Sequence, residues 1–238
     1  MGFDPVYLAI IIVGMAVSGL AALYVKLSFN RGAKVGLQSG LTGREIALRI
    51  LHHEGITDVT VHEHQGFLSD HYNPGSKTLN LSPAVYSGSS AAAAGVAAHE
   101  VGHALQHAQG DMTMWGRTIL VYPAHFGAMF APWLVIAGVM LAGGQALLPG
   151  SASYLIAVTG VVLFGVATLC SLVIVVNELN ASKRARVVLA DMGITRPGEE
   201  DDAVRSVLTA AGLTYMAAAL LSLVQLLYWA SIVFGRRD

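Results

Sequence analysis

The sequence predicts an α-helical membrane protein with about four transmembrane helices and a small α+β domain. Hydrophobic residues make up 54% of the 238 positions and charged residues only 12%, against about 25% charged in typical globular chains. The apolar residues are concentrated in long runs, because the stretches 6–25, 118–177 and 206–235 contain no Asp, Glu, Lys or Arg. The polar segment between the first two runs instead shows the alternation and turn residues of a folded domain.

Each long run can supply one or two membrane spans. About 20 apolar residues in a helix cross a bilayer core of about 30 Å, so the run 118–177 is long enough for two helices. The residues Leu-Pro-Gly-Ser at 148–151 predict the turn between them. We expect a retained anchor at the N-terminus rather than a cleaved signal peptide, because no Lys or Arg precedes Lys26. The four predicted spans are 6–26, 122–147, 152–177 and 211–234.

The basic residues predict the orientation of these spans. Seven Lys and Arg residues lie in segment 26–117 and five lie in segment 183–205. Cytoplasmic segments of membrane proteins carry an excess of Lys and Arg, so we expect both segments on the cytoplasmic side of the cell membrane. Arg236 and Arg237 do not fit this orientation, because four spans place them outside the cell. The basic residues of the two polar segments outnumber them, so we keep the orientation.

The pattern of polar and apolar segments also predicts how the chain is divided. The polar segment 27–117 has the pattern of a small folded domain. The expected parts are an N-terminal transmembrane anchor at 1–28, an α+β domain at 29–117, a transmembrane hairpin at 118–177, a cytoplasmic helical segment at 178–210 and a C-terminal transmembrane helix at 211–238.

Local signals within 29–117 predict two helices with strands between them. Thr42 and Glu45 form a capping box that begins the first helix. A longer helix should cover 91–109, capped by Ser89 or Ser90. Alternating residues predict strands at 58–64, 67–72 and 77–82, and Ser82-Pro83 can begin a short helix.

The long predicted helix carries the motif H-E-x-x-H at His99, Glu100 and His103. Residues i and i+4 lie on one face of a helix, about 5–6 Å apart, so the two imidazoles can converge on one metal ion. Glu100 stands beside them, where it can take a proton from an attacking water molecule. The spacing indicates one Zn²⁺ per chain with Glu100 as the catalytic base. The alternative is a helix with two surface histidines.

A zinc site of this kind needs a third protein ligand. His107 continues the series, but it lies about 12 Å along the helix axis from His99, so a straight helix cannot bring both to one ion. Glu178 is the first charged residue after the long apolar run, on the membrane side shared with the H-E-x-x-H helix. From the residues alone, Glu178 is either the third ligand or an interfacial carboxylate beside Lys183 and Arg184.

Other residues narrow the possible partners and roles. The net charge of −1 gives no electrostatic reason to expect a nucleic-acid partner. The single cysteine, Cys170, excludes an internal disulfide and a cysteine-based metal cage.

His71 or Tyr72 could stabilise the oxyanion of a tetrahedral intermediate, with strand packing as the alternative. Solvated surface histidines are expected at His52, His53, His62 and His64.

Three stretches of the sequence resemble the YugP-like bacterial membrane zinc metallopeptidases. The stretches are 70–82, beginning Asp-His-Tyr-Asn-Pro-Gly, 95–107, which contains H-E-x-x-H, and 177–185, beginning Asn-Glu-Leu-Asn-Ala-Ser. The likeness extends over nearly the whole chain, spans included. This family is similar to the HtpX-type membrane gluzincins, in which a glutamate well after H-E-x-x-H is the third zinc ligand.

The resemblance therefore implies a zincin-like metallopeptidase domain at 29–117, with Glu100 as the catalytic base. It also implies that His99, His103 and Glu178 are the three zinc ligands. The chain departs from the family at Asn180, where an aspartate is usual. If that aspartate orients a zinc-bound histidine, the uncharged Asn180 does so more weakly.

The function that the resemblance implies is a zinc-dependent endopeptidase embedded in the lipid bilayer. It would hydrolyse peptide bonds of membrane-associated proteins near the cytoplasmic face, and strand 77–82 is the expected edge for an extended peptide. One alternative is an intramembrane protease of the site-two type, which the Ser-, Gly- and Ala-rich stretch 87–98 disfavours. Another is a non-catalytic membrane protein with a structural metal, which would have no use for Glu100.

Overall fold

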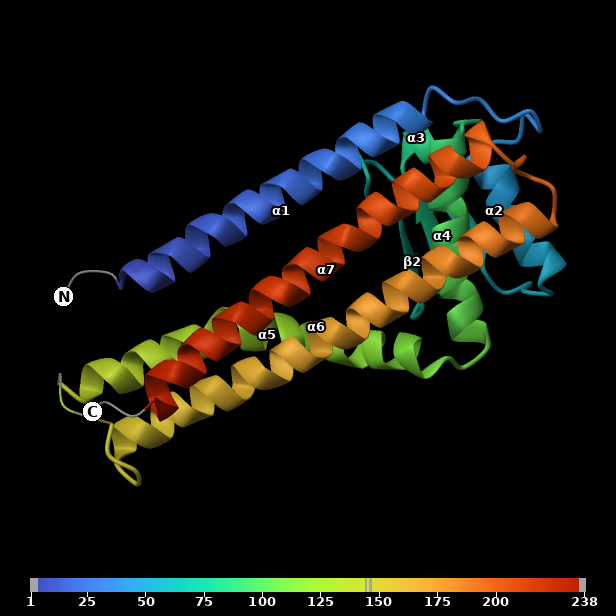
Figure 1. The fold of residues 1–238 in the computed structure, drawn as a ribbon. Helices are drawn as coiled ribbons and strands as arrows, with labels where there is room; N and C mark the ends of the chain where they lie inside the picture. Colours follow the sequence, from blue (N-terminus) through green and yellow to red (C-terminus); the bar gives the residue numbers. More distant parts are fainter. Residues whose placement is uncertain (1–3, 144, 146, 236–238) are drawn as a thin grey trace. The chain divides into compact units, whose positions relative to one another are not determined.

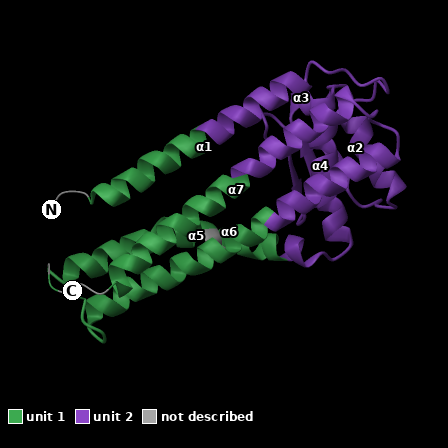
Figure 2. Cartoon of the chain, in the orientation of Figure 1, with its two compact units in different colours: residues 1–19, 116–175, 215–238 green, residues 20–115, 176–214 purple. Residues whose placement is uncertain are grey.

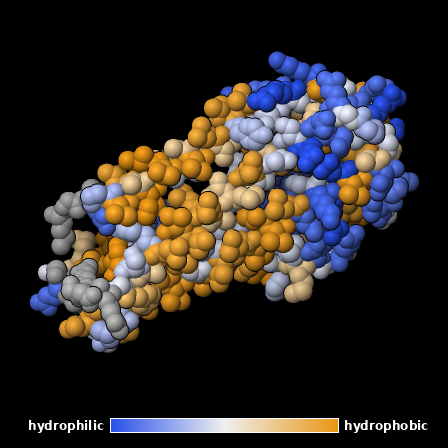
Figure 3. All heavy atoms as spheres, in the orientation of Figure 1, coloured by the Kyte–Doolittle hydropathy of each residue, from blue (hydrophilic) through white to orange (hydrophobic). Residues whose placement is uncertain are grey.

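The computed structural model describes residues 4–143, 145 and 147–235, which form seven helices and three strands (Figure 1). The contacts divide these residues into two units (Figure 2). Unit 1 takes its residues from 1–19, 116–175 and 215–238, and unit 2 consists of 20–115 and 176–214. In the space-filling view, hydrophobic side chains cover most of the visible surface of unit 1, and hydrophilic side chains gather over unit 2 (Figure 3).

Long apolar helices dominate the chain. Three of the described helices are long and apolar enough to cross a membrane: α1 (Pro5–Gly32), α6 (Ala152–Asp191) and α7 (Glu199–Phe234). The helix α5 (Met112–Leu141) bends by 46° between its parts Met112–Tyr122 and His125–Leu141, and it is a fourth candidate if both parts form one span. The number of spans therefore agrees with the predicted four when the bent helix counts as one.

The bounds of these helices differ from the predicted spans. The second predicted span reaches residue 147, but α5 ends at Leu141, where Gly143 adopts a left-handed φ of +63° that stops the helix. The third predicted span ends at 177, but α6 continues to Asp191, because the polar residues after 177 are mostly good helix formers. The predicted turn at 148–151 is present, and the Ser151 N–H donates to the Leu148 carbonyl at 3.0 Å.

Small residues allow close helix packing within unit 1. A Cβ atom on Gly138 would lie 2.6 Å from the Ser153 carbonyl oxygen, and one on Gly160 would lie 2.8 Å from the Ala131 carbonyl oxygen. The two glycines therefore let α5 and α6 approach backbone to backbone. Small residues at such contacts are typical of helices that pack within a membrane.

Unit 2 contains the sheet and the H-E-x-x-H helix. The helix α2 (Gly43–His53) begins with the predicted capping box, since Thr42 and Glu45 each bond the other's backbone N–H. Helix α4 (Ala91–Ala108) follows the cap residue Ser90, and Gly110 after it has a φ of +64°. Within unit 2, fully buried apolar side chains from α2, the sheet, α3, α4, α6 and α7 form one core: Ile46, Ile50, Leu79, Leu81, Val85, Val101, Leu189 and Val204.

The sheet differs from the prediction in its order. Its strands are β1 (Thr60–Glu63), β2 (His71–Asn73) and β3 (Thr78–Leu81), and they lie in the order β1-β3-β2. The expectation that strand 77–82 is an edge is therefore wrong. β3 is the central strand, antiparallel to β2 and parallel to β1, and its Leu79 and Leu81 are fully buried.

Two local predictions next to the sheet are also corrected. The predicted strand 67–72 is reduced to its last residues, because Gly66 and Leu68 have φ values of +128° and +53°, which extended strands do not adopt. Ser82 precedes the short helix α3 (Pro83–Tyr86) but makes no side-chain cap. Its hydroxyl instead donates to Asp70 Oδ2 at 3.0 Å.

Candidate metal centre

The side chains of His99, His103 and Glu178 meet between α4 and α6 in unit 2. One nitrogen of each histidine and one carboxylate oxygen all lie within 4.8 Å of one another. His99 Nε2 is 3.1 Å from Glu178 Oε2, and His103 Nε2 is 3.6 Å from Glu178 Oε1. The structure thus brings together three predicted residues that are up to 79 positions apart in the chain.

A glycine within the motif allows the two helices to come this close. A Cβ atom on Gly102 would lie 2.8 Å from the Ala181 carbonyl oxygen and 3.3 Å from the Ala181 Cα. Real Cβ atoms do not approach a backbone oxygen so closely, so only glycine fits at this position without a shift of α6. Gly102 therefore determines how near the histidines of α4 come to Glu178 of α6.

A buried carboxamide fixes the orientation of His103. Gln106 is 0% exposed, and its Nε2 donates to the Asn177 backbone carbonyl at 3.1 Å and to Asn180 Oδ1 at 3.2 Å. A backbone carbonyl can only accept, so the amide orientation of Gln106 is determined. Its Oε1 then accepts from Asn177 Nδ2 at 2.9 Å and lies 3.0 Å from His103 Nδ1.

This arrangement determines the tautomer of His103. Since Gln106 Oε1 cannot donate, the proton on His103 must lie on Nδ1. In the neutral ring the lone pair is then on Nε2, the nitrogen that faces Glu178. A histidine that binds a metal through one nitrogen usually donates the other N–H to a fixed acceptor, and Gln106 is in the position of that acceptor.

The second histidine and Asn180 have different partners. His99 Nδ1 lies 3.1 Å from the Ser182 hydroxyl. Asn180 Oδ1 instead accepts from Gln106 Nε2 at 3.2 Å and from Arg184 Nε at 2.6 Å. The hypothesis that residue 180 orients a histidine directly is therefore replaced by an indirect contact through Gln106.

Glu100 is held by the sheet rather than by α6. Its Oε2 accepts the backbone N–H of Tyr72 at 2.9 Å, and the carboxylate is buried. In the antiparallel pair β2–β3, backbone groups alternate between facing the partner strand and facing away. The Tyr72 N–H therefore faces away from β3, so the outer edge of β2 lies at Glu100.

The remaining candidates lie near this edge. The Tyr72 hydroxyl is 2.8 Å from His107 Nδ1, and burial raises the Tyr72 pKa. His107 does not belong to the metal group, in agreement with the argument that a straight helix cannot bring it to the same ion as His99. His71 is exposed and contacts the Ser69 carbonyl at 2.8 Å. An oxyanion role for His71 or Tyr72 stays a prediction.

The histidines that were expected on the surface are exposed: His52, His53, His62 and His64.

Asp70 supports the same end of the sheet. Its Oδ1 accepts the Ser82 N–H at 2.6 Å and its Oδ2 accepts the Ser82 hydroxyl. Burial raises the pKa of Asp70 above its usual value, although the bonds from Ser82 act in the opposite direction; the nearby Glu100 also raises it. The carboxyl thus links the residue before β2 to the start of α3, which precedes α4.

The donor set fits a zinc ion. Two imidazole nitrogens and one carboxylate oxygen are the protein ligands of catalytic zinc sites that keep the fourth position open. His103 and Glu178 are almost completely buried, so the site is shielded from competing solvent. Gln106 Oε1 accepts at His103 Nδ1, which leaves Nε2 as the ring nitrogen that could bind a metal.

Sequence reasoning did not identify Gly102, Gln106 or the Tyr72 N–H as parts of this site. A signal existed for two of them. Glycine in a helix interior costs about 1 kcal/mol relative to alanine, so Gly102 indicates close packing. Gln106 is a polar residue three positions after His103, within reach of its ring. The Tyr72 contact depends on strand pairing and has no local signal.

Comparison with known proteins agrees with this site. The family described as "Putative neutral zinc metallopeptidase" matches residues 7–234. The chain is 39% identical over 232 residues to the "Putative membrane protease YugP" of Bacillus subtilis (strain 168), covering 98% of each protein. No solved structure matches the chain.

Proposed function

The chain belongs to this zinc metallopeptidase family, and from that premise we propose that it is a membrane-embedded endopeptidase of the gluzincin type. The single observation that carries the proposal is the meeting of His99, His103 and Glu178 within 4.8 Å. In this proposal the three residues bind one Zn²⁺ per chain, and Glu100 is the catalytic base.

The chemistry follows from the residues around the ion. A zinc ion held by these ligands would polarise a peptide carbonyl and lower the pKa of water. Glu100 then accepts the proton of the attacking water and passes a proton to the leaving amine. The Tyr72 N–H holds Glu100 Oε2 at 2.9 Å, which fixes the carboxylate while its other oxygen remains available for proton transfer.

The substrate is proposed to be an extended peptide beside β2. Because β3 is the central strand, the edges of the sheet are β1 and β2, and β2 is the one that contacts Glu100. An extended chain can add to such an edge through main-chain hydrogen bonds. The Tyr72 carbonyl, which like its N–H faces away from β3, is the proposed acceptor for the peptide backbone.

The membrane topology is part of the same proposal. The chain is proposed to cross the cell membrane several times, with both polar segments in the cytoplasm, because Lys and Arg are concentrated at 26–117 and 183–205. The substrates would be membrane-associated proteins cleaved near that face. A cysteine introduced at Gly75, an exposed turn position, should resist a membrane-impermeant thiol reagent in intact cells; ready labelling would contradict the orientation.

The site-two alternative is less well supported. In such proteases the H-E-x-x-H helix lies within a strongly apolar span, whereas α4 packs against α2, α3 and the sheet of unit 2. Helix α4 is also not one of the described helices that are long and apolar enough to cross a membrane.

The proposal is tested with Glu100→Gln, purified in detergent beside the wild type. The variant should keep one zinc per chain, because Glu100 is not a ligand, but cleave fluorescein-labelled casein at least about 100-fold more slowly. Glu63→Gln, on the exposed face of β1, is the matched control and should keep both properties. A zinc-loaded Glu100→Gln with undiminished cleavage would exclude this mechanism.

A further inference from the structure

We propose that a cavity beside the catalytic helix is a substrate subsite that selects a basic side chain, lysine or arginine. The cavity has a volume of about 290 Å³ and lies within unit 2. Small-molecule sites begin at about this size, so the space suits one amino-acid side chain. The inference rests on the proposed peptidase function and adds its preferred substrate class.

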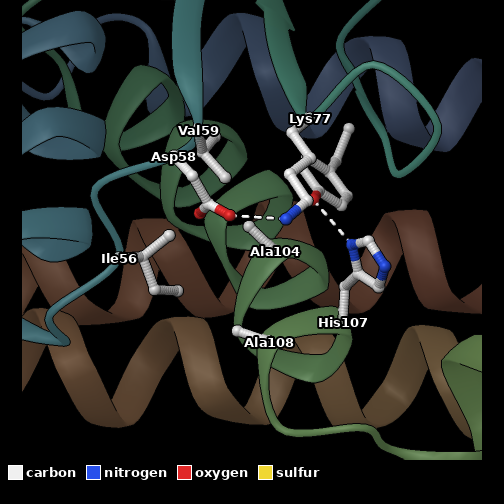
Figure 4. A pocket seen from close by; sticks show the side chains of 8 residues that line it. Ile56, Asp58, Val59, Lys77, Ala104, His107 and Ala108 are labelled. Atoms are coloured by element: carbon white, nitrogen blue, oxygen red, sulfur yellow. Dashed lines mark hydrogen bonds and ion pairs between the residues drawn. The ribbon is translucent and has the colours of Figure 1, made fainter.

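The cavity is connected to Glu100 through two elements. Ala104 and His107 line it from α4, four and seven positions after Glu100, and therefore lie on the same face of the helix. Tyr72 lines it from β2, while the Tyr72 backbone N–H holds Glu100. The small side chain of Ala104 leaves room above the helix, as the close-up shows (Figure 4).

A peptide beside β2 would direct one side chain toward this cavity. Residues directly opposite each other on neighbouring strands place their side chains on the same face of the sheet. The Tyr72 side chain lies on the face that lines the cavity. The substrate residue paired with Tyr72 would therefore point to the same face, and its side chain can enter the cavity.

A charged pair next to this space determines which side chain fits. Lys77 Nζ donates to Asp58 Oδ2 above Ala104 (Figure 4). The Asp58 side chain is 59% exposed and that of Lys77 is 49% exposed. Exposed ion pairs shift an equilibrium by no more than about fivefold, so a ligand of like charge can displace one partner.

The two partners are not equally able to move. Lys77 has four methylene groups, and its backbone is anchored because its carbonyl accepts the Thr60 N–H at 3.1 Å; its ammonium can swing into solvent. Asp58 has a single methylene and stays beside the cavity. The hydrogen bond from Lys77 also keeps the Asp58 pKa below its usual value, so the carboxylate is charged at neutral pH.

Lys77 therefore holds the place of a substrate cation in the free protein. A basic side chain entering the cavity would replace the Lys77 ammonium at Asp58 and lie along the Tyr72 ring, which favours cations. An acidic side chain would pair with Lys77 but would meet the Asp58 carboxylate, which cannot withdraw. The geometry thus favours lysine or arginine over glutamate.

The test compares cleavage of matched peptides by the zinc-loaded, detergent-purified protein. One peptide that the wild type cleaves is resynthesised with Lys, norleucine or Glu at each of the three positions on either side of the scissile bond. The wild type should prefer Lys over norleucine at one position by about tenfold in kcat/KM, the scale of a charge-assisted hydrogen bond. Asp58→Asn should reduce that ratio to about one.

Lys77→Met should change the ratio in the opposite direction. Removing the competing ammonium should raise the preference for Lys by about two- to fivefold. If the pair served only to stabilise the fold, both variants would act alike. The exchange variant Asp58→Lys/Lys77→Asp should instead prefer Glu. Asp201→Asn is the matched control. Asp201 forms an ion pair with Arg186 at 3.2 Å, and neither residue lines the cavity, so the ratio should stay unchanged.

The outcomes separate this inference from the proposed function. Cleavage without any preference for Lys at the six positions overturns the subsite but not the peptidase. The same conclusion follows if Asp58→Asn and Lys77→Met change the Lys-to-norleucine ratio in the same direction. A zinc-loaded wild type that cleaves none of the peptides and no casein overturns the proposed function, and the subsite with it.

Discussion

The two sides of α4 are built from different kinds of contact. On the side facing α6, Gln106, Asn177 and Glu178 are 2% exposed or less, and the neutral amides of Gln106 and Asn177 are hydrogen-bonded to each other. On the side facing the sheet, the Asp58–Lys77 pair is about half exposed. Buried hydrogen bonds are costly to leave unmade, whereas exposed ion pairs can be exchanged at little cost.

The difference suggests a division of roles. The α6-facing side holds groups whose geometry must not vary, because a metal ligand that moves loses the ion. The sheet-facing side holds groups that can change partners when a substrate enters. Mutations on the first side should therefore act on zinc binding and stability, and mutations on the second should act on substrate preference.

The largest effect is expected from the carboxylate on α6. Glu178→Ala should purify without zinc, because removal of one of three protein ligands leaves two histidines and no anionic donor. His107→Ala, on the sheet-facing side, should keep one zinc per chain. Zinc content of the purified proteins, measured by elemental analysis, decides between them. A metal-free His107→Ala with a zinc-loaded Glu178→Ala would contradict the ligand assignment and require α4 to bend.

The next effect is expected from the carboxamide that orients His103. Gln106→Met keeps the length of the side chain but removes the acceptor for His103 Nδ1, and zinc affinity should fall by about 10–100-fold. The same change would remove one acceptor of the Asn177 amide, which also donates to Thr113, and the Gln106 N–H that donates to the Asn177 carbonyl. Affinity is measured by competition with a zinc chelator of known strength.

The matched control for this variant lies on the same helix end. Gln109→Met removes an exposed carboxamide that accepts from Arg184 rather than from a histidine. Its zinc affinity should stay within about twofold of the wild type, since a group that only contacts surface charge contributes little. Equal losses in the two variants would show that Gln106 acts through general stability and not through His103.

A smaller effect, on thermal stability, is expected where α4 and α6 are in contact at Gly102. Gly102→Ala adds only a Cβ, which would meet the Ala181 carbonyl oxygen at 2.8 Å, and such overpacking costs about 1–3 kcal/mol. Alanine in a helix would by itself stabilise the protein by about 1 kcal/mol. A net fall in the thermal unfolding temperature therefore identifies the clash. Gly36→Ala, where a Cβ would meet nothing within 4 Å, should change it little; a stabilised Gly102→Ala would refute the close contact.

The sequence allowed one side of this comparison to be predicted much better than the other. Helical spacing places His99 and His103 on one face without further information. The position of Glu178 after an apolar run made it a candidate, and the family resemblance supplied the rest. Helix caps such as Thr42, Glu45 and Ser90 were predictable because they depend on neighbouring residues only.

The sheet-facing side depends on pairing between distant residues. Nothing local requires β3 to lie between β1 and β2, and the error about the edge strand follows from that. The cavity needs Asp58, Lys77 and His107 to converge from a loop, a turn and a helix, which only the folded chain determines. Exposed charges also carry no pattern that distinguishes a subsite from a solvated surface.

The smallest effect is expected at Ser182, and it tests whether burial is what separates strong from weak positioning contacts. Ser182 Oγ lies 3.1 Å from His99 Nδ1, as Gln106 Oε1 lies 3.0 Å from His103 Nδ1. The two contacts thus have nearly the same length, but the His99 side chain is 12% exposed and that of His103 only 3%. Water can replace the hydroxyl at His99, while no such substitute reaches His103.

Ser182→Ala should therefore weaken zinc binding by only about two- to fivefold, below the range expected for a fixed outer contact, and by clearly less than Gln106→Met. Chelator competition on both variants in the same detergent provides the comparison. If Ser182→Ala loses as much affinity as Gln106→Met, exposure does not set the strength of these contacts. The two histidines would then depend equally on their outer partners, and the contrast between buried and exchangeable contacts would hold only between the two sides of α4 and not within the metal centre.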